Sequence, residues 1–399
     1  MKKIAILGFG IVGSGVAEVL TENKISIESK LGEEIEIKYI LDLRDFPDSP
    51  FGDRVVHDFN IILNDPEGCL VAEMMGGSHP AYDFSKAAIL AKKNVVTSNK
   101  EVVARFGAEL LALAAENGVR YMFEASVGGG IPIIRPMICD LVSNKITSID
   151  GILNGTTNYI LTQMSEYGTS FDQALKEAQA KGYAEANPTA DVEGLDAARK
   201  IVILAALAFG KCISPEDISV RGISSVTTAD FEVAASLGYT IKLIGHAEPK
   251  DEKIFATVSP RFVPLSSPLA HISDVYNGIL VGANMLDQVL FYGKGAGKLP
   301  TASAVVADIV DILEHMGSNQ LATIKWEDAS ACDIASADDY SCKFCIISDN
   351  TTDKTSDNAE KVCTVCSKTA VITKKMTKAE CDLLADELGI KPTAIYQIL

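Results

Sequence analysis

The chain has 399 residues, of which 47% are hydrophobic and 22% charged, and its net charge is −17. These proportions predict a globular protein with two or three cores, and the acidic balance argues against a surface that binds nucleic acid or anionic membranes. No apolar run approaches the ~18 residues of a membrane span, and the first residues do not resemble a signal peptide. We therefore expect a cytoplasmic protein whose nine cysteines are reduced.

A glycine-rich turn follows the first predicted strand, at residues 3–7, and precedes a helical pattern that runs from Val16 to Leu20. Its Gly-x-Gly-x-x-Gly motif consists of Gly8, Phe9, Gly10, Ile11, Val12 and Gly13. The first glycine permits a tight turn, the second lets the backbone approach a pyrophosphate, and the third lets the helix pack closely on the strand. The motif therefore predicts a dinucleotide cofactor bound at the helix N-terminus.

The second predicted strand, at residues 35–41, ends beside Asp42 and Arg44. At this position a carboxylate receives the ribose 2′-hydroxyl of NAD, whereas an arginine accepts the 2′-phosphate of NADP. Because both side chains are present, the sequence is compatible with NAD and with NADP.

Further strands are predicted at residues 69–77 and 94–99, with a helix at 80–93 between them. This alternation predicts a parallel, doubly wound sheet of the Rossmann type. Ligands bind such sheets at the carboxyl ends of the strands, where Ser98 and Lys100 lie. A lysine at the start of the next predicted helix, at 101–117, opposes the helix dipole, so we expect Lys100 to have a function.

Glu124 is followed closely by three consecutive glycines, Gly128 to Gly130. Two interpretations are open for this segment. Its carboxylate and backbone carbonyls are hard oxygen ligands that suit a cation, or the glycines form a flexible crossing between domains.

The stretch from Gly182 to Lys200 places carboxylates and a lysine at the start of an apolar helix, predicted at 195–209 and ended by Gly210. Asp196 and Lys200 are four residues apart and share one helix face. They are either an ordinary surface pair or, because the helix is apolar, a pair that serves a cleft.

Together these segments resemble the homoserine dehydrogenase family over roughly residues 1–320. The resemblance rests on the segments 8–13, 98–100, 124–132, 153–160, 182–200, 293–297 and 300–304. It implies an NAD(P)-dependent, reversible reduction of L-aspartate 4-semialdehyde to L-homoserine, on the route to threonine, methionine and isoleucine. The family commonly has an acidic residue where this chain has Asn187, so we expect a slightly weaker charge there.

The resemblance also implies roles for individual residues. Lys200 resembles the proton donor and Lys100 its catalytic partner, while Glu185 and Asp196 resemble the carboxylates that hold the substrate. The remaining substrate positions are Asp191, Tyr183, Gly155 and Thr156. The cofactor positions are the glycine motif, Arg44, Ser98, Lys100, Gly182 and Gly297. A sodium site is implied at Glu124 with the carbonyls of Val127, Gly129 and Ile131, and a homodimer or homotetramer is implied through the sheet of the middle domain.

The chemistry of an aldehyde reduction agrees with these roles. The developing alkoxide needs a proton, which a lysine supplies, and the substrate ammonium needs carboxylate partners. There are two alternatives: a dehydrogenase for a related aldehyde or hydroxyacid, and an inactive dinucleotide sensor. The presence of both Lys100 and Lys200 speaks against the sensor. Cys69, Cys139 and Cys212 lie in apolar contexts, so no catalytic cysteine is expected.

The last eighty residues contain Cys342, Cys345, Cys363 and Cys366 in the spacing C-x2-C-x17-C-x2-C. This spacing is typical of a structural zinc site. The same region also predicts strands at 340–347 and 361–373, a helix at 378–388 and a strand at 393–399, which is similar to a shortened ACT domain without metal. Both interpretations remain open.

The expected fold is therefore α/β in three parts. Residues 1–135 form a Rossmann-like dinucleotide-binding domain, completed by about 301–320. Residues 136–300 form an α+β catalytic and dimerisation domain, and residues 325–399 form a small α+β regulatory-type module, ACT-like or zinc-binding.

Overall fold

The computed structural model describes residues 1–68, 70–316, 324 and 326–399. The chain divides into two compact units, each assembled from separate segments. The first unit contains Met1–Ser143, Ala206–Cys212 and Gly293–Asp328, and the second contains Asn144–Ala205, Ile213–Tyr292 and Ala329–Leu399. None of the helices in the described ranges has both the length and the apolar character needed to cross a lipid bilayer.

The first unit is built on a six-stranded sheet in which every pairing is parallel, with the order β3-β2-β1-β4-β5-β6. Its strands are β1 (Lys2–Leu7), β2 (Ile35–Leu41), β3 (Val55–Val56), β4 (Leu70–Glu73), β5 (Val95–Thr97) and β6 (Tyr121–Met122). This order is that of a dinucleotide-binding Rossmann sheet, in which the order of strand addition reverses between β1 and β4 while all strands stay parallel. The predicted parallel sheet is confirmed.

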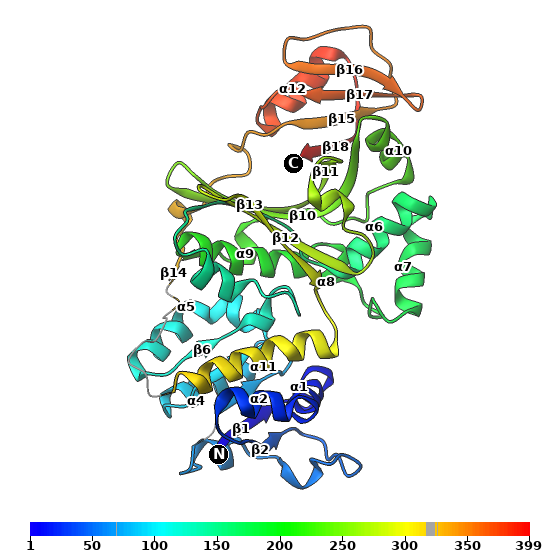
Figure 1. Cartoon of the computed structure of the whole chain (residues 1–399). Coiled ribbons are helices and arrows are strands. Elements are labelled where there is room, and N and C mark those ends of the chain that lie inside the picture. The colour runs from blue at the N-terminus through cyan, green and yellow to red at the C-terminus, as the bar shows by residue number, and fades with distance from the viewer. Residues whose placement is uncertain (69, 317–323, 325) are drawn as a thin grey trace. The chain divides into compact units, whose positions relative to one another are not determined.

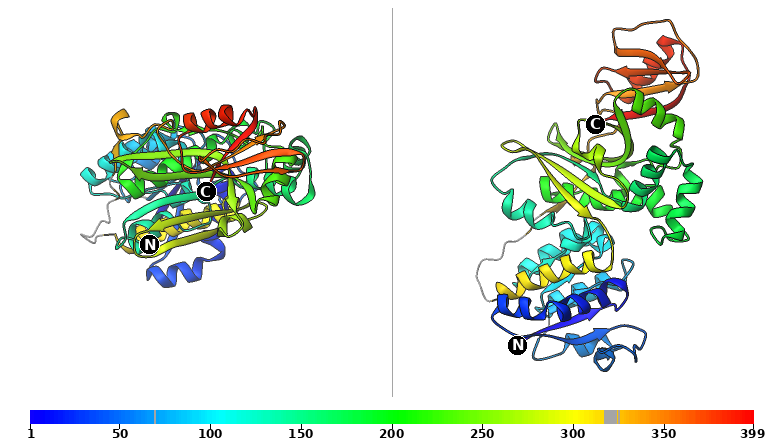
Figure 2. Two further views of the ribbon diagram at one scale, coloured as in Figure 1. Left: turned by 90° about the horizontal axis from the view of Figure 1, so that it is seen from above. Right: turned by 45° about the vertical axis from the view of Figure 1, so that its right-hand side comes forward.

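Helices connect and cover these strands. They are α1 (Ile11–Glu22), α2 (Lys24–Leu31), α3 (Phe59–Leu63), α4 (Ala81–Leu90), α5 (Lys100–Asn117) and α11 (Lys298–Glu314). Helix α11, drawn in yellow, lies beside α1, drawn in blue (Figures 1 and 2). A Cβ on Gly15 of α1 would approach the carbonyl oxygen of Lys298 to 2.9 Å, so this glycine permits close packing. Residues almost 300 positions apart thus share one core, which includes Val16, Ala302 and Ile309.

Short elements complete the first unit. They are the 3-10 turns at Gly52–Arg54 and Glu124–Ser126, the π-helical turn at Pro136–Asp140, and a parallel pair formed by β8 (Lys211–Cys212) and β14 (Glu327–Asp328).

The second unit is built on a ten-stranded mixed sheet with the order β13-β12-β7-β10-β11-β18-β15-β17-β16, in which β9 also pairs with β11. Its strands are β7 (Ile146–Ile152), β9 (Ser219–Val220), β10 (Tyr239–Lys250), β11 (Lys253–Pro264), β12 (Tyr276–Ala283), β13 (Asp287–Lys294), β15 (Phe344–Ser348), β16 (Ala359–Val365), β17 (Lys368–Thr373) and β18 (Pro392–Ile398). The C-terminal strands therefore continue the sheet of the preceding residues through the parallel pairing of β18 with β11.

The helices of the second unit are α6 (Gly155–Tyr167), α7 (Phe171–Ala180), α8 (Thr189–Val192), α9 (Leu195–Phe209), α10 (Thr228–Ser236) and α12 (Lys378–Leu388). Short 3-10 turns lie at Pro215–Asp217, Pro268–His271 and Ala331–Asp333. Helix α9 has the predicted bounds, and Gly210 follows it with a φ of +79°. The strand predicted at 361–373 is wrong in one respect: a tight turn at Cys366 and Ser367, both with positive φ, divides it into β16 and β17.

Candidate active site

The glycine motif forms the turn between β1 and α1, and Gly8 and Gly13 each have a conformational or steric reason. Gly8 has a φ of +88°, which favours glycine. A Cβ on Gly13 would lie 2.0 Å from the carbonyl oxygen of Gly8, so the helix could not pack there with a larger residue. Gly10, the N-cap of α1, has no neighbouring atom within 4 Å of such a Cβ. That open space beside a helix N-terminus fits a phosphate group.

Asp42 and Arg44 form an ion pair just after β2. The Asp42 carboxylate accepts a hydrogen bond from Phe9 N at 2.8 Å and from Arg44 Nε at 3.0 Å, and these contacts lower its pKa to about 2. The Arg44 side chain is 63% exposed. The carboxylate thus holds the glycine turn, while the guanidinium faces outward from the same edge of the sheet.

Ser98 and Lys100 lie at the carboxyl end of β5, and Lys100 is the first residue of α5. Between them, the Asn99 side chain accepts hydrogen bonds from the backbone of Glu101 and Val102 and donates to the carbonyls of Met75 and Gly77. Asn99 therefore caps α5 and ties the β4 and β5 ends together. The predicted cofactor residues after β1, β2 and β5 consequently share one edge of the sheet.

Below this edge lies Glu73, the last residue of β4, which is fully buried. It accepts hydrogen bonds from Thr97 Oγ1 at 2.5 Å and Met75 N at 2.6 Å. Burial nevertheless raises its pKa from the ordinary 4.5 to about 7.

This raised pKa predicts a pH-dependent stability. Because the folded state holds the proton more tightly than the unfolded state, Glu73 favours folding at low pH, and that contribution falls as the pH rises from 4.5 to about 7. We expect the free energy of unfolding of Glu73→Gln, relative to the native protein, to increase over this range by about 3 kcal/mol. Urea unfolding at several pH values measures it, with the exposed Glu22→Gln as control. Parallel pH profiles for Glu73→Gln and the native protein would contradict the assignment.

In the second unit, Lys200 and Asp196 form a buried pair on α9. Lys200 Nζ donates to Asp196 Oδ2 at 2.7 Å and to the carbonyl of Leu153 at 2.8 Å. The exposed fractions of Lys200 and Asp196 are only 8% and 6%, so this is not an ordinary surface pair.

Asn154 connects this pair to a second carboxylate. Its Nδ2 donates to Asp196 Oδ2 at 2.9 Å and to Asp191 Oδ1 at 2.7 Å. Its Oδ1 accepts from Thr157 N, so the same side chain caps α6. The Asn154 amide thus links Asp191 to Asp196, which is in turn paired with Lys200.

The other predicted substrate residues lie around the start of α6 and the end of α7. Thr156 Oγ1 donates to the carbonyl of Tyr183 at 2.6 Å, and Gly155 is the first residue of α6. Gly182 follows α7 with a φ of +74°. Glu185 is exposed two residues beyond Tyr183, and its backbone carbonyl accepts a hydrogen bond from Gln179 Nε2 at 3.1 Å.

The segment after Glu124 is a compact turn within the first unit. Both carboxylate oxygens of Glu124 accept backbone N–H groups, from Ile133, Ile134 and Arg135, at 2.7–2.8 Å. A Cβ on Gly129 would lie 2.5 Å from the carbonyl oxygen of Gly295, and Gly130 N donates to the Lys294 carbonyl at 3.0 Å. The glycines are therefore explained by close packing against the loop that ends at Gly297, rather than by a flexible crossing.

Comparisons with known proteins agree across the chain. Residues 8–124 match the NAD-binding domain of homoserine dehydrogenase and residues 132–310 match the homoserine dehydrogenase domain. A homoserine dehydrogenase of Synechocystis is 46% identical over 319 residues, which are 78% of this chain and 73% of that protein. A homoserine dehydrogenase from Lactococcus lactis is 43% identical over 78% of this chain and 74% of its own length.

The chain belongs to the homoserine dehydrogenase family. It is an NAD(P)-dependent oxidoreductase acting on a CH–OH group, which reversibly reduces L-aspartate 4-semialdehyde to L-homoserine in threonine, methionine and isoleucine biosynthesis. The structure of a Thiobacillus denitrificans homoserine dehydrogenase matches all of this chain and 98% of that one, with a TM-score of 0.89 and 31% identity. An archaeal homoserine dehydrogenase mutant in complex with NADPH covers 80% of this chain, with a TM-score of 0.68 and 29% identity.

In this homoserine dehydrogenase the C-terminal cysteines do not gather. Cys342 packs with Phe344 and Ile346 in the core under α12, and Cys345, between the last two, points to the opposite face of β15. Burial raises the pKa of Cys345 to about 12, which disfavours the thiolate that zinc needs. Cys363 lies on β16, which β17 separates from β15, and Cys366 is in the exposed turn. The structure does not support the zinc alternative; these cysteines are strand and turn residues.

The three cysteines that precede residue 330 differ in their settings. Cys212 is buried, and burial raises its pKa to about 12, as expected of an inert thiol. Cys139 is exposed, so its expected apolar setting is wrong. Cys69 lies outside the described residues.

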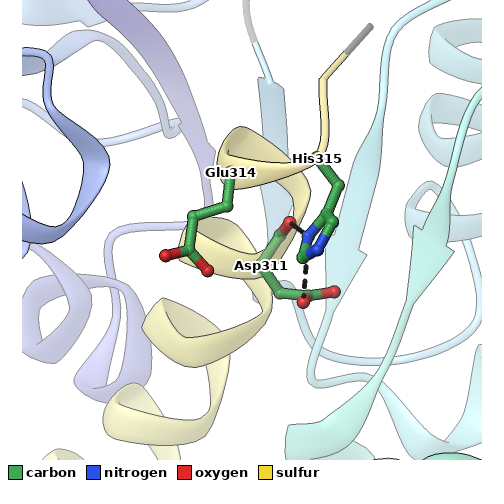
Figure 3. Close-up of side chains that lie close together, drawn as sticks. All are labelled: Asp311, Glu314 and His315. Atoms are coloured by element: carbon green, nitrogen blue, oxygen red, sulfur yellow. Dashed lines mark hydrogen bonds and ion pairs between the residues drawn. The ribbon is translucent and has the colours of Figure 1, made fainter. Parts of the chain in front are cut away.

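One group of metal-type ligands does come together among the described residues: Asp311, Glu314 and His315, around the last turn of α11 (Figure 3). His315 Nδ1 bonds the Asp311 carbonyl at 2.8 Å. The Asp311 carboxylate, however, is already paired with Arg120 at 2.7 Å and Arg135 at 2.8 Å. These cations neutralise it, so we assign the group a structural role.

Sequence reasoning missed the importance of Asn154, although it lies inside the 153–160 motif. Its side chain links two carboxylates that follow it by 37 and 42 residues. An asparagine before a predicted helix signals an N-cap, but that signal does not reveal distant partners.

Proposed function

We propose that Lys200 is the residue of this homoserine dehydrogenase that protonates the substrate oxygen. The observation that carries this proposal is the buried Lys200–Asp196 pair. Two N–H groups of the ammonium are directed to Leu153 O and Asp196 Oδ2, which fixes the nitrogen and leaves its third N–H for a substrate oxygen. A nicotinamide cofactor, when bound, would supply the hydride for the aldehyde carbon. Lys200 gives its proton to the resulting oxygen and regains one from water.

We infer that Asp196 and Glu185 hold the substrate ammonium, with Asp191 and Tyr183 beside them, and that Gly155 and Thr156 receive its carboxylate. The N-terminus of α6 supports the last assignment, because backbone N–H groups there favour an anion. Lys100, at the start of α5 in the cofactor-binding unit, is proposed as the second catalytic lysine. Loss of turnover with retained cofactor binding in Lys200 variants tests the central assignment.

We propose that the enzyme uses both NAD and NADP. Asp42 offers an acceptor for a ribose hydroxyl, and the exposed Arg44 offers a guanidinium for a 2′-phosphate. The two groups lie next to each other, with Arg44 Nε 3.0 Å from Asp42 Oδ1. The remaining cofactor contacts are assigned to the glycine motif, Ser98, Gly182 and Gly297.

Arg44→Ala is expected to raise the KM for NADPH by about ten- to a hundredfold, the scale of a lost charge-assisted hydrogen bond. The KM for NADH is expected to stay within about twofold, since NADH lacks the phosphate. Initial rates with each cofactor measure both values, and the exposed neighbour Leu43→Ala serves as control. Equal effects on the two cofactors would show that Arg44 does not read the 2′-phosphate.

We propose a sodium ion at Glu124 and the carbonyls of Val127, Gly129 and Ile131. These four residues are buried. Among the described residues, no backbone N–H group forms a hydrogen bond to any of the three carbonyls. Burial raises the pKa of Glu124 against the opposing effect of three backbone hydrogen bonds and Arg135. A hard monovalent cation would give the three carbonyls a partner and hold the 128–131 turn.

Sodium is therefore expected to stabilise the fold by about 2 kcal/mol when its concentration is well above its Kd. Thermal unfolding in sodium chloride, potassium chloride and choline chloride at equal ionic strength measures this, without any assay of activity. The transition should be highest in sodium. The same Tm in sodium and choline would contradict the site.

We further propose that residues 1–135 with about 301–320 bind the dinucleotide, that 136–300 catalyse and dimerise, and that 325–399 form an ACT-like regulatory module in a cytoplasmic enzyme. Support for a homodimer comes from β13, an edge strand of the large sheet that exposes Leu290 and Tyr292. Sedimentation of the native chain and of a Leu290→Glu/Tyr292→Glu variant tests this interface. A native monomer would exclude it.

A further inference from the structure

One buried side chain, that of Asn154, joins three helices of the second unit. Asn154 lies just beyond β7 and is only 6% exposed. Its Oδ1 accepts a hydrogen bond from Thr157 N at 2.9 Å and so caps α6. Its Nδ2 donates to Asp191 Oδ1 of α8 at 2.7 Å and to Asp196 Oδ2 of α9 at 2.9 Å. An amide nitrogen carries two N–H bonds, so the two carboxylates take both of them.

Helix capping alone does not explain an asparagine at this position. Serine and aspartate cap helices about as well, because each offers an oxygen to a backbone N–H group of the first turn. Neither could replace the amide, however, because serine has one O–H donor and an ionised aspartate has none. What requires an asparagine here is the simultaneous donation to Asp191 and Asp196.

The groups that Asn154 joins are those proposed to hold the two charged ends of the substrate. Gly155 and Thr156, the proposed carboxylate site, directly follow Asn154 in the chain. Asp191 and Asp196 belong to the proposed ammonium site. In an α-amino acid the ammonium and the carboxylate are attached to the same carbon atom, so the two sites must be held at a short, fixed spacing for both contacts to form. Asn154 sets this spacing, because it starts α6 and is bonded to both carboxylates.

The preceding residue holds the other member of the α9 pair. Leu153 O accepts a hydrogen bond from Lys200 Nζ at 2.8 Å. Leu153 is itself 1% exposed, and a Cβ on Gly245 of β10 would lie 2.9 Å from its Cδ1, so it is closely packed against the large sheet. Two consecutive residues thus fix Lys200 and Asp196 to the end of β7, at the point where α6 begins.

We propose that Asn154 is a positioning residue, which holds the ammonium-binding carboxylates at the spacing from the α6 N-terminus that an α-amino acid requires. It acts through Asp191 and Asp196 and does not contact the substrate. The inference rests on the proposed function of these carboxylates and of Gly155 and Thr156. It makes Asn154 a determinant of specificity for substrates that carry an ammonium group beside the carboxylate.

Asn154→Ser keeps a capping oxygen but removes both amide donors. The KM for L-aspartate 4-semialdehyde is expected to rise at least about tenfold, the scale of a lost charge-assisted hydrogen bond. The KM for the nicotinamide cofactor is expected to stay within about twofold, since Asn154 is bonded to proposed substrate residues. Initial rates of the full-length enzyme measure both values, and circular dichroism shows that the variant is folded.

Succinate semialdehyde tests the substrate class, because it has the aldehyde and the carboxylate of the substrate but no ammonium. In Asn154→Ser its kcat/KM should change by less than about threefold, whereas that of L-aspartate 4-semialdehyde should fall at least about tenfold. The variant therefore discriminates less between the two aldehydes than the native enzyme. Equal losses for both aldehydes would contradict a role in holding the ammonium site.

Asn154→Asp is the matched control, because aspartate has nearly the same shape and caps a helix equally well. It places a third carboxylate beside Asp191 and Asp196, close to the Lys200 ammonium, so at pH 8 its KM defect should exceed that of Asn154→Ser. At lower pH the three carboxylates share a proton, which restores one donor. Relative to the native enzyme at the same pH, the defect should shrink at least about threefold between pH 8 and pH 6. A residue that only caps α6 would show no such dependence.

A double-mutant cycle with Asp191→Ala tests whether Asn154 acts through that carboxylate. The KM increase of Asn154→Ser/Asp191→Ala should be at least about threefold below the product of the two single increases. If Asp191→Ala alone raises KM and the cycle is additive, the inference is wrong while the ammonium site stands. If Asp191→Ala leaves KM unchanged, the proposed contact of Asp191 fails, and the inference fails with it. Native KM values in both Asn154→Ser and Asn154→Asp would show that Asn154 is a helix cap alone.

Discussion

Lys200→Met is expected to lower kcat for the reduction of L-aspartate 4-semialdehyde by at least about 100-fold, the scale of a lost general acid. Methionine keeps the length of the side chain but cannot donate a proton or stabilise the alkoxide charge. Asp196 retains its hydrogen bond from Asn154, so the carboxylate is not left without a donor. Steady-state rates at saturating substrate and cofactor measure the effect.

Two controls separate protonation from folding and binding. Lys200→Arg keeps the positive charge, but its guanidinium does not release a proton, so turnover should stay low. Fluorescence titration with NADPH should give the native Kd for both variants, because most of the predicted cofactor residues, including the glycine motif, belong to the other compact unit. Near-native kcat in Lys200→Met would refute the assigned role.

The second large effect is expected at Asp196. Asp196→Ala leaves the Lys200 ammonium buried with only the Leu153 carbonyl of its two present acceptors. Removing one partner of a buried ion pair costs about 3–5 kcal/mol of unfolding free energy. The substrate ammonium also loses a partner, so KM for the aldehyde should rise along with the loss of stability.

Glu185→Ala is the matched comparison, because Glu185 is proposed to bind the same ammonium but is exposed. Its stability should stay within about 0.5 kcal/mol of the native protein, while its KM rises. Urea unfolding and initial rates on both variants separate the two contributions. If Asp196→Ala were as stable as Glu185→Ala, the inference that the buried Asp196–Lys200 pair stabilises the fold would be contradicted.

The parts of the fold that could be predicted are those encoded by local patterns. The strand, glycine turn and helix at residues 2–22 carry requirements at Gly8 and Gly13, and the structure shows the tight turn and the close helix packing expected there. The bounds of α9 follow from an apolar run ended by Gly210 in the same way. Spacing of four residues sufficed to predict the Asp196–Lys200 pair.

The parts that could not be predicted depend on distant contacts. Asn154 acquires its function from Asp191 and Asp196, and the turn at Cys366–Ser367 lacks the Asn-Gly pattern that signals a tight hairpin. The cysteine spacing suggested zinc because spacing does not say on which face of a strand a side chain lies.

The most direct test of the account is the oxidation of NADPH and of NADH by the purified enzyme with L-aspartate 4-semialdehyde, followed by absorbance and by identification of the product. Both cofactors should be consumed, with one L-homoserine formed per cofactor oxidised. No turnover with either cofactor would contradict the assignment of this chain as a working homoserine dehydrogenase.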